Sequence, residues 1–215
     1  MSIIIKTPQF DRVLERGTMA KKIVIVSGSP KKDGNTETLI KWFCEGAAAE
    51  GAEVSVVRAA QWKLKANGCI SCRMCQKNKE YGCVLQDDAT AALLQMSRSD
   101  VIVMATPLYF FSASAQIKIL VDRMFSLYKW NNEANTMETI LKGKTMVLLA
   151  TAYENTGLDA LEKPFILTAE YTGMKYSSLL VPNAGVSGQI VKLPAIREKA
   201  AALGKQVAQS TFLSL

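Results

Sequence analysis

The chain has 215 residues, of which 49% are apolar and 21% charged, and its formal net charge is +7. This length suits one main domain, and the ordinary composition excludes a disordered or fibrous chain. Histidine is absent, which excludes mechanisms based on a Ser-His or Cys-His pair and zinc sites with imidazole ligands. Chemistry must therefore come from a cofactor, a thiolate, a lysine or carboxylates.

The apolar runs and the distribution of charge also indicate where the protein is located and which partners it has. The purely apolar runs at 101–105 and 146–150 are far shorter than the ~18 residues that cross a bilayer. The isoleucine run at 3–5 is too short for a secretory signal, so we expect a cytoplasmic protein with no membrane partner. The positive charge is spread along the chain without a basic stripe, so we expect no nucleic-acid partner.

Residues 1–20 precede the first predicted strand and form an N-terminal extension, whereas residues 21–215 form the predicted domain. Two interpretations of the extension stay open. Met19 could be the genuine start of the protein, or the extension could be an arm exchanged between subunits.

Short β-branched runs alternate with longer segments in which apolar residues recur at helical spacing. This alternation predicts an α/β fold, a three-layer, doubly wound, five-stranded parallel sheet with a cysteine-containing insertion after the second strand. We expect Asp87 and Asp88 to cap the helix that follows them, Gly173 to end a helix, and Pro194 to lie in a first turn. The predicted strands are 22–26, 53–57, 101–105, 146–150 and 177–181, and the helical stripes run through 39–47, 89–96, 117–124, 161–168 and 193–207.

In such a sheet, ligands bind at the carboxyl ends of the strands, where the strand order switches. The loop after the first strand, 27–36, carries hydroxyls and glycines and leads into a helix, which favours an anionic group such as phosphate. It matches neither a Walker A loop nor the GxGxxG fingerprint. The alternative is a polar strand-to-helix turn in which Asn35 or Thr36 only caps the helix.

Three consecutive aromatic residues, Tyr109, Phe110 and Phe111, follow the third predicted strand. Such a run is costly to leave in water, so a flat ligand or a partner subunit should cover it. The alternative is that Phe110 and Phe111 are ordinary core residues.

Four of the five cysteines fall within fifteen positions, with the spacing Cys69-x2-Cys72-x2-Cys75-x7-Cys83. Three thiolates at two-residue intervals can bind one face of a cubane cluster. The seven residues before Cys83 are enough for the fourth thiolate to reach the same cluster. A [4Fe-4S] site is therefore one interpretation; unligated thiols, a regulatory disulfide and zinc are the others. Cys44 stands at core-like helical spacing, and we expect it to be buried and inert.

The loop GSPKKDGNT at 28–36, together with TPLYFFSASAQIKILVDR at 106–123, resembles the flavodoxin-like NAD(P)H-dependent FMN reductases and their iron-sulfur flavoprotein branch. The resemblance covers roughly residues 21–190 and implies bound FMN. By position, it implies phosphate contacts from the first loop, ring contacts from the second, and contacts on the other side of the ring from the loop after the fourth strand. These residues are Ser27, Ser29, Lys31, Gly34, Asn35 and Thr36; Pro107, Leu108, Tyr109, Phe110 and Phe111; and Thr151, Ala152, Tyr153 and Glu154.

The resemblance also implies a function. We expect an FMN-dependent oxidoreductase that takes electrons from NAD(P)H or from an acidic carrier such as ferredoxin, and that assembles as a homodimer or homotetramer. One alternative is a flavodoxin-type carrier, although the charge of +7 argues against it, since true flavodoxins are strongly acidic. Another is a cofactor-free flavodoxin-like interaction module.

Other polar and aromatic residues have ordinary structural interpretations. Lys118, Asp122 and Arg123 match the family's K...DR signature, but their helical spacing favours a structural set of ion pairs. The tryptophans at 42, 62 and 130 are interpreted as packing residues.

Overall fold

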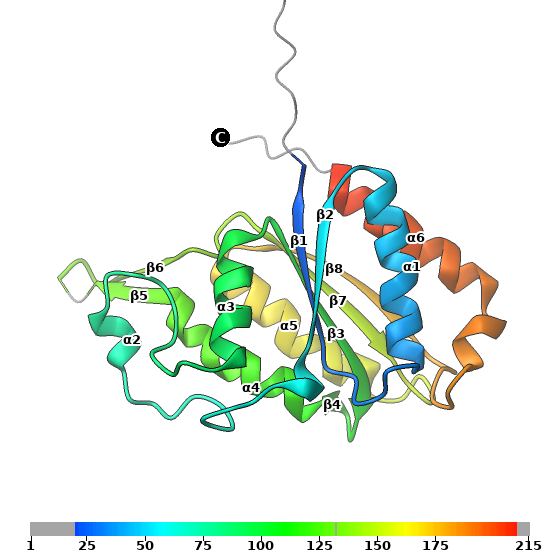
Figure 1. The fold of residues 1–215 in the computed structure, drawn as a ribbon, viewed down its shortest axis with the longest axis horizontal. Coiled ribbons are helices and arrows are strands. Elements are labelled where there is room, and N and C mark those ends of the chain that lie inside the picture. The colour runs from blue at the N-terminus through cyan, green and yellow to red at the C-terminus, as the bar shows by residue number, and fades with distance from the viewer. Residues whose placement is uncertain (1–19, 132, 210–215) are drawn as a thin grey trace, which may run out of the picture.

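The computed structural model describes residues 20–131 and 133–209, so the expectation for the extension at 1–20 lies outside the described residues apart from Ala20. Five parallel strands form the central sheet in the order β2-β1-β3-β7-β8 (Figure 1). This confirms the doubly wound parallel sheet. The strands are β1 (Lys22–Ser27), β2 (Glu53–Arg58), β3 (Val101–Tyr109), β7 (Thr145–Thr151) and β8 (Lys175–Val181).

The burial of each strand reflects its place in the sheet. All seven residues of β7 and the first six of β3 are buried, because helices cover both faces of these central strands. The edge strand β2 has no fully buried residue. In register, Ser27 at the end of β1 lies beside Ala105 of β3, and Pro107 of β3 lies beside Thr151 of β7. The loops after these strands therefore emerge at one edge.

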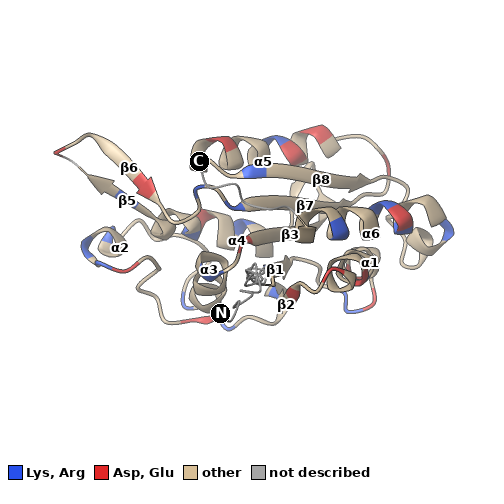
Figure 2. Cartoon of the chain, turned by 90° about the horizontal axis from the view of Figure 1, so that it is seen from above, with Lys and Arg blue, Asp and Glu red and all other residues tan. Residues whose placement is uncertain are grey.

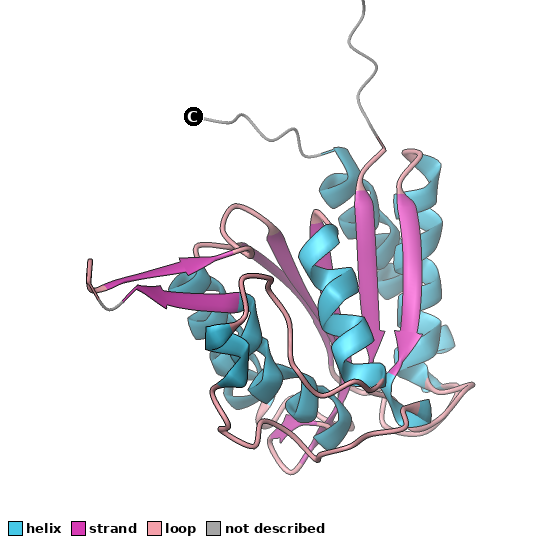
Figure 3. Cartoon of the chain, turned by 60° about the vertical axis from the view of Figure 1, so that its left-hand side comes forward, coloured by secondary structure: helices cyan, strands magenta, loops and turns pink. Residues whose placement is uncertain are grey.

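Helices cover the two faces of the sheet (Figure 3). One core contains side chains of α1 (Asn35–Ala49) and α6 (Pro194–Gln209). The other contains side chains of α3 (Asp88–Arg98), α4 (Ala115–Arg123) and α5 (Leu158–Thr172). The sequence therefore predicted the layers and the position of each major helix correctly.

Two glycines let α1 and α6 pack closely. A Cβ on Gly46 would lie 1.9 Å from the carbonyl oxygen of Ala201, and one on Gly204 would lie 2.1 Å from that of Phe43. Any side chain at either position would separate the helices.

The predicted helix ends are confirmed except for Asp88, which is the first residue of α3 and accepts a hydrogen bond from the backbone N–H of Lys63 instead of capping the helix. The Asp87 side chain accepts a hydrogen bond from the backbone N–H of Thr90 and caps α3. Gly173 ends α5 in the left-handed conformation, and Pro194 is the first residue of α6.

Several short elements are absent from the sequence prediction. β4 (Ser112–Ala113) folds back antiparallel to β3, and β5 (Tyr128–Asn131) pairs antiparallel with β6 (Thr136–Thr139) in a hairpin that projects from the body (Figure 1). The insertion after β2 contains α2 (Met74–Lys77). The 3-10 turns are η1 (Ala59–Gln61), η2 (Met124–Leu127) and η3 (Gln189–Lys192).

Charged residues of both signs are scattered over the helices and loops, as expected from the sequence (Figure 2). Among the described residues, no helix combines the length and apolar character that crossing a membrane requires.

Candidate functional site

A cavity of about 280 Å³ lies at the carboxyl ends of the strands. The chain continues from β1 to β2 on one side of β1 and then crosses back to β3 on its other side. The strand order therefore switches at β1, beside this cavity. The cavity is lined by the loops after β1, β3 and β7, as predicted, and also by the loop after β8. The lining residues are Ser29, Lys31, Gly34, Asn35, Thr36, Pro107, Leu108, Tyr109, Thr151, Ala152, Tyr153, Ala184, Gly185 and Ser187.

The loop after β1 brings the start of α1 to one end of the cavity. Gly34 precedes the helix and gives no side-chain cap. The first N–H groups of a helix have no acceptor within it, so the start of this 15-residue helix can bind an anion. Ser29 shapes the loop, since its hydroxyl donates to the carbonyl of Lys31 at 3.1 Å and can accept from the N–H of that residue at 3.3 Å.

The capping role considered for Asn35 and Thr36 is wrong. The Asn35 side-chain nitrogen donates to the carbonyls of Ala184 and Val186, and its oxygen accepts from the N–H of Ile190. Asn35 therefore holds the loop after β8 against the cavity, and its side-chain amide is already engaged. Thr36 is buried, and its hydroxyl is hydrogen-bonded to another side chain rather than to the helix.

The prediction that Ser27 contacts a phosphate is wrong, because Ser27 does not line the cavity. It is fully buried, and its hydroxyl donates to the carboxylate of Glu37. Glu37 also pairs with Arg58 at 3.1 Å, so Ser27 belongs to a polar network behind the loop.

The end of β3 and the turn after it divide into a lining part and a projecting tip. Pro107, Leu108 and Tyr109 line the cavity. Phe110 and Phe111 form the turn between β3 and β4 and lie outside the lining, with 98% and 57% of their surfaces exposed. The core-packing alternative for these two residues is therefore wrong, and so is their expected position along the cavity.

The turn holds both phenylalanines in an unusual backbone conformation. The φ angles of Phe110 and Phe111 are +45° and +63°, in the left-handed region that bulky residues rarely adopt. The Phe111 ring lies against Gly157, where an added Cβ would come within 2.3 Å of it.

The loop after β7 contributes Thr151, Ala152 and Tyr153, whereas Glu154 is exposed and outside the lining. Residues after β8 were missed by the sequence reasoning: Ala184, Gly185 and Ser187. The signal for them was available, since the fifth predicted strand also ends at this edge and is followed by a glycine-containing run.

The charged side chain in the lining of this cavity is a cation, Lys31. The Lys31 ammonium lies 3.5 Å from the hydroxyl of Ser187, so a cation faces the loop after β8 beside the positive end of the α1 dipole. The donors and the apolar walls together fit a molecule with an anionic end and a flat apolar part, as FMN has.

The four clustered cysteines line a second cavity together with Arg73 and Arg123. Cys69 and Cys72 are exposed, Cys83 is half-buried and Cys75 is buried, and all five cysteines of the chain are free. Within residues 20–131 and 133–209, no group of three or more cysteines or carboxylates is close enough to hold a metal ion. The type and number of donors fit a cluster, and the common cavity brings them together, but the sulfurs are not at ligating positions.

A buried ion pair anchors one side of the cysteine cavity. Arg123 and Asp87 are both almost completely buried, and the guanidinium donates to the carboxylate at 2.8 Å. Lys118 and Asp122 form a second pair on the surface of α4. The structural interpretation of Lys118, Asp122 and Arg123 is therefore confirmed. Burial acts to lower the pKa of Arg123, but the hydrogen bond with Asp87 and the proximity of Cys83 outweigh burial and raise it.

Strand β5 also anchors the cysteine segment. The Lys129 ammonium donates to three backbone carbonyls of the cysteine segment, those of Cys75 at 2.6 Å, Asn78 at 2.7 Å and Glu80 at 2.8 Å. Because all three ammonium hydrogens of Lys129 bind carbonyls of this segment, Lys129 fixes the backbone conformation of residues 75–80.

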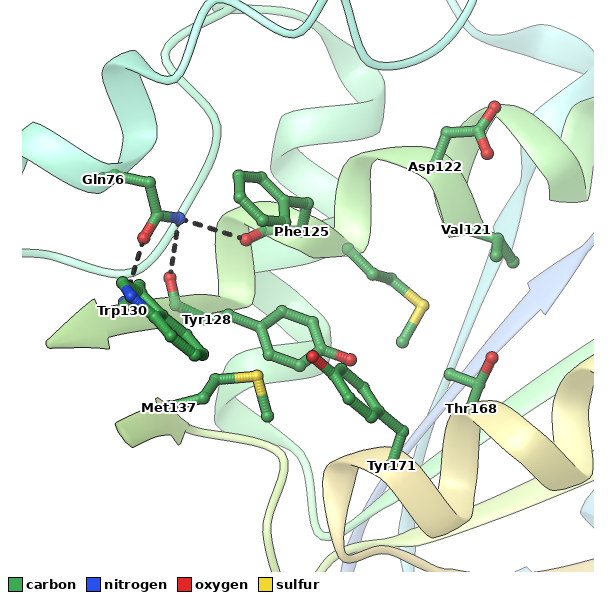
Figure 4. Close-up of a pocket in the computed structure, with 10 residues that line it drawn as sticks. Gln76, Val121, Asp122, Phe125, Tyr128, Trp130, Met137, Thr168 and Tyr171 are labelled. Carbon is green, nitrogen blue, oxygen red and sulfur yellow. Dashed lines mark hydrogen bonds between the residues drawn. The ribbon is translucent and has the colours of Figure 1, made fainter. Parts of the chain in front are cut away.

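Gln76, next to Cys75, strengthens this attachment (Figure 4). Its side-chain nitrogen donates to the carbonyls of Tyr128 at 3.0 Å and Phe125 at 3.4 Å, and its oxygen accepts from the N–H of Trp130 at 3.1 Å. The projecting hairpin therefore supports the cysteine cavity.

Trp42 and Trp130, both interpreted as packing residues, differ in their burial. Trp42 is buried, but Trp130 is 51% exposed and lines a cavity of about 260 Å³ with Tyr128, Met137 and Tyr171 (Figure 4). The packing interpretation of Trp130 is wrong, because the hairpin that carries it was not predicted.

Fold and cavity together define a flavodoxin-like α/β protein with a cavity at the start of α1, and the comparisons with known proteins identify its family. Residues 21–181 match the family model of NADPH-dependent FMN reductase, so the chain belongs to that family. Curated relatives place it in the iron-sulfur flavoprotein branch.

Two of these relatives show how far the similarity extends. The chain is 38% identical over 102 residues to an iron-sulfur flavoprotein of Methanocaldococcus jannaschii, covering 47% of this chain and 51% of that protein. It is 30% identical over 146 residues to an iron-sulfur flavoprotein of Archaeoglobus fulgidus, covering 68% of this chain and 69% of that protein. The chain thus spans about half the length of the first relative.

Solved structures support the fold. The NAD(P)H:quinone oxidoreductase from Methanothermobacter marburgensis superimposes with a TM-score of 0.67 at 16% identity, covering 87% of this chain and 99% of that one. An FMN-dependent NADH-azoreductase from Bacillus anthracis, solved with FMN, gives 0.66 at 13% identity, covering 87% and 100%.

Proposed function

We propose that this protein is an FMN-dependent oxidoreductase that binds FMN in the cavity at the carboxyl ends of β1, β3, β7 and β8. The observation that carries the proposal is the cavity itself, in which three loops singled out from the sequence converge around the start of α1. An anionic end and an apolar wall occur together there, as FMN requires.

The lining residues bind different parts of FMN according to their position in the cavity. The α1 N-terminus, Ser29 and Lys31 bind the phosphate, which they favour through N–H groups and positive charge. Pro107–Tyr109 form one wall for the ring, and Tyr153 lies at the other side. The bound cofactor supplies the hydride-accepting chemistry, so the chain needs no histidine acid or base.

We also propose that Cys69, Cys72, Cys75 and Cys83 hold a [4Fe-4S] cluster. Support comes from the common cavity and from the names of the similar proteins, which are called iron-sulfur flavoproteins. Ligation requires the four sulfurs to come closer together than they lie in the structure. Such a cluster passes single electrons, and this role suits an acidic carrier such as ferredoxin as donor.

The donor and the assembly complete the proposal. NAD(P)H is the donor favoured by the family, and the net charge of +7 suits an acidic protein partner. A homodimer or homotetramer would cover the exposed tip at Phe110 and Phe111.

The test uses the full-length protein purified without oxygen. Its absorption spectrum, its affinity for added FMN and its steady-state oxidation of NADH and NADPH with an added acceptor are measured. We expect bound flavin and turnover with at least one nicotinamide. Flavin without turnover from either nicotinamide or reduced ferredoxin indicates the carrier alternative, and failure to bind FMN indicates the cofactor-free module.

A further inference from the structure

Arg123 has a buried donor that none of its structural contacts uses. It is 1% exposed, at the end of α4, and it lines the cysteine cavity. One terminal nitrogen, Nη1, donates to Asp87 at 2.8 Å, and the other, Nη2, donates to Thr90 at 2.7 Å and approaches the carbonyl of Leu85 at 3.4 Å. The Nε–H is buried and has no hydrogen-bond partner among the described residues.

A buried cation with an unpaired donor lowers the stability of the folded chain. We therefore expect this donor to gain an acceptor when a ligand binds. The acceptors that the cavity can provide beside Arg123 are the cysteine sulfurs, since the other lining side chains are mostly apolar or cationic. A neutral thiol is a weak acceptor, whereas a thiolate is a strong one. Cys83 is the cysteine already in electrostatic contact with the guanidinium.

We propose that Arg123 is a positioning residue for the cysteine site: its Nε–H donates to the Cys83 sulfur when the four cysteines bind a metal. This inference rests on the proposed metal-binding role of the four cysteines. Each thiol that binds metal releases its proton to solvent, and the metal–thiolate centre is then anionic. The guanidinium fixes the fourth ligand and offsets part of this negative charge.

A purely structural role for Arg123, as the partner of Asp87, makes a different prediction. In that case, the loss of either partner would disturb the cavity equally. The two roles separate when Asp87 is neutralised first, because Asp87→Asn removes the ion pair while the cation stays in the cavity. Asp87→Asn alone leaves a buried cation without its partner and should lower stability, whereas replacing both members of the pair with neutral residues of similar volume is often tolerated. The single variant therefore serves as the reference only where it is shown to be folded.

The experiment titrates the full-length, reduced, metal-free chain with Cd²⁺ alone and follows cadmium–thiolate absorbance. Asp87→Asn is compared with Asp87→Asn/Arg123→Gln and Asp87→Asn/Arg123→Met, and circular dichroism checks that each variant is folded. Gln can place a neutral donor near the original Nε, whereas Met places none. Arg73→Gln, which removes an exposed cation from the same cavity, is the matched control.

We expect the Met double variant to bind Cd²⁺ about tenfold or more weakly than Asp87→Asn, since a hydrogen bond to a charged group contributes about 1.5 kcal/mol or more. The Gln double variant should lie between them, and Arg73→Gln should change affinity far less. Equal affinities among the three Asp87→Asn proteins would overturn the role of Arg123 alone. Wild-type protein that binds no Cd²⁺ would overturn the cysteine site as well.

Discussion

The hydroxyl oxygens of Thr36 and Thr151 lie 2.8 Å apart, and both residues are buried. This contact joins the start of α1 to the end of β7 across the cavity, so the phosphate end and the ring end of the proposed FMN site are held in one arrangement. Either hydroxyl can be the donor. Where Thr151 donates, the Thr36 hydroxyl keeps its hydrogen for a phosphate oxygen.

The first prediction concerns phosphate binding. Ser29→Ala combined with Thr36→Ala should weaken FMN binding by about 1–3 kcal/mol, because the change removes the hydroxyl that shapes the phosphate loop and a hydroxyl that can donate to the phosphate. Riboflavin, which lacks the phosphate, should lose much less affinity. Fluorescence titration of both flavins measures the difference.

Thr38→Ala provides the control for this pair. Thr38 is in the same turn of α1, but its hydroxyl donates to the carbonyl of Gly34 and the residue is outside the cavity lining. It should leave both affinities unchanged. Equal losses for FMN and riboflavin in the double variant would contradict the phosphate assignment.

The second prediction concerns iron. If one cluster is bound, a reconstituted wild-type chain should contain about four irons, and each single change of Cys69, Cys72, Cys75 or Cys83 to Ser should abolish iron binding. Cys44→Ser should leave the iron content intact, since Cys44 lies in α1 on the other face of the sheet. Iron and flavin are measured on the same samples, and flavin should survive because the two cavities share no lining residue.

Iron-free wild-type protein after anaerobic reconstitution, with normal NAD(P)H oxidation, would remove the cluster from the proposal. The FMN reductase function would then stand alone.

The third prediction concerns the anchoring of Cys75. Lys129→Met should free the segment 75–80 from β5, because three carbonyls lose their shared donor. Cys75, which is buried in the wild-type chain, should then react faster with iodoacetamide. Mass spectrometry of the alkylated peptides gives the rate for each cysteine.

Lys118→Met is the matched control, because Lys118 makes only an exposed ion pair with Asp122. It should leave the rate at Cys75 unchanged. An unchanged rate in Lys129→Met as well would show that Lys129 does not hold the segment.

The sequence predicted the sheet and its helices because these elements bury continuous or periodic apolar runs. The five strands and the ends of helices α3, α5 and α6 follow from local signals such as β-branched residues, Asp87, Gly173 and Pro194. Three loops of the candidate site were placed correctly because the carboxyl ends of parallel strands share an edge.

What the sequence could not supply depends on contacts between distant segments. Asn35 has the residue type of a helix cap, but tertiary contacts 149 and 151 residues away take its side chain. Each strand of the β5–β6 hairpin has only four residues, too few for a reliable alternating pattern, and its role becomes visible through the contacts of Lys129 with the cysteine segment and of Gln76 with β5. The sequence predicts that a flat ligand, a partner subunit or the core covers Phe110 and Phe111, because no local signal indicates a tight turn at two bulky residues.

The fourth prediction is a pH dependence of stability. Burial, followed by Glu37 and Glu45, raises the pKa of the Cys44 thiol from 9.0 to about 11. The folded state therefore favours the neutral thiol, and this contribution is fully present below the pKa of the unfolded chain. It should be lost as the pH rises from about 9 toward 11. Urea unfolding across this window should show a steeper fall in the free energy of unfolding for wild type than for Cys44→Ala.

Parallel curves for the two proteins would contradict this assignment. The comparison isolates Cys44, because lysines and tyrosines that titrate in the same window are present in both chains.

The fifth prediction concerns association through the tip of the β3–β4 turn. Phe110 is 98% exposed at a φ of +45°, so it combines a solvation cost with backbone strain in the isolated chain. A second subunit that covers the ring would offset both. Phe110→Asn should therefore weaken self-association about tenfold or more, since burying a phenylalanine contributes about 1.5–3 kcal/mol. Sedimentation and solution scattering across protein concentrations measure the effect.

The same variant should not destabilise the isolated subunit, because Asn adopts the left-handed conformation readily. This separates lost association from a lost fold, and urea unfolding at low protein concentration checks it. Tyr171→Gln is the control: Tyr171 is 67% exposed on α5 and lines a different cavity, so its loss should leave association through the tip intact. A wild-type protein that is monomeric while fully loaded with flavin would contradict the prediction, because the ring at 110 would then be stable in water without a partner.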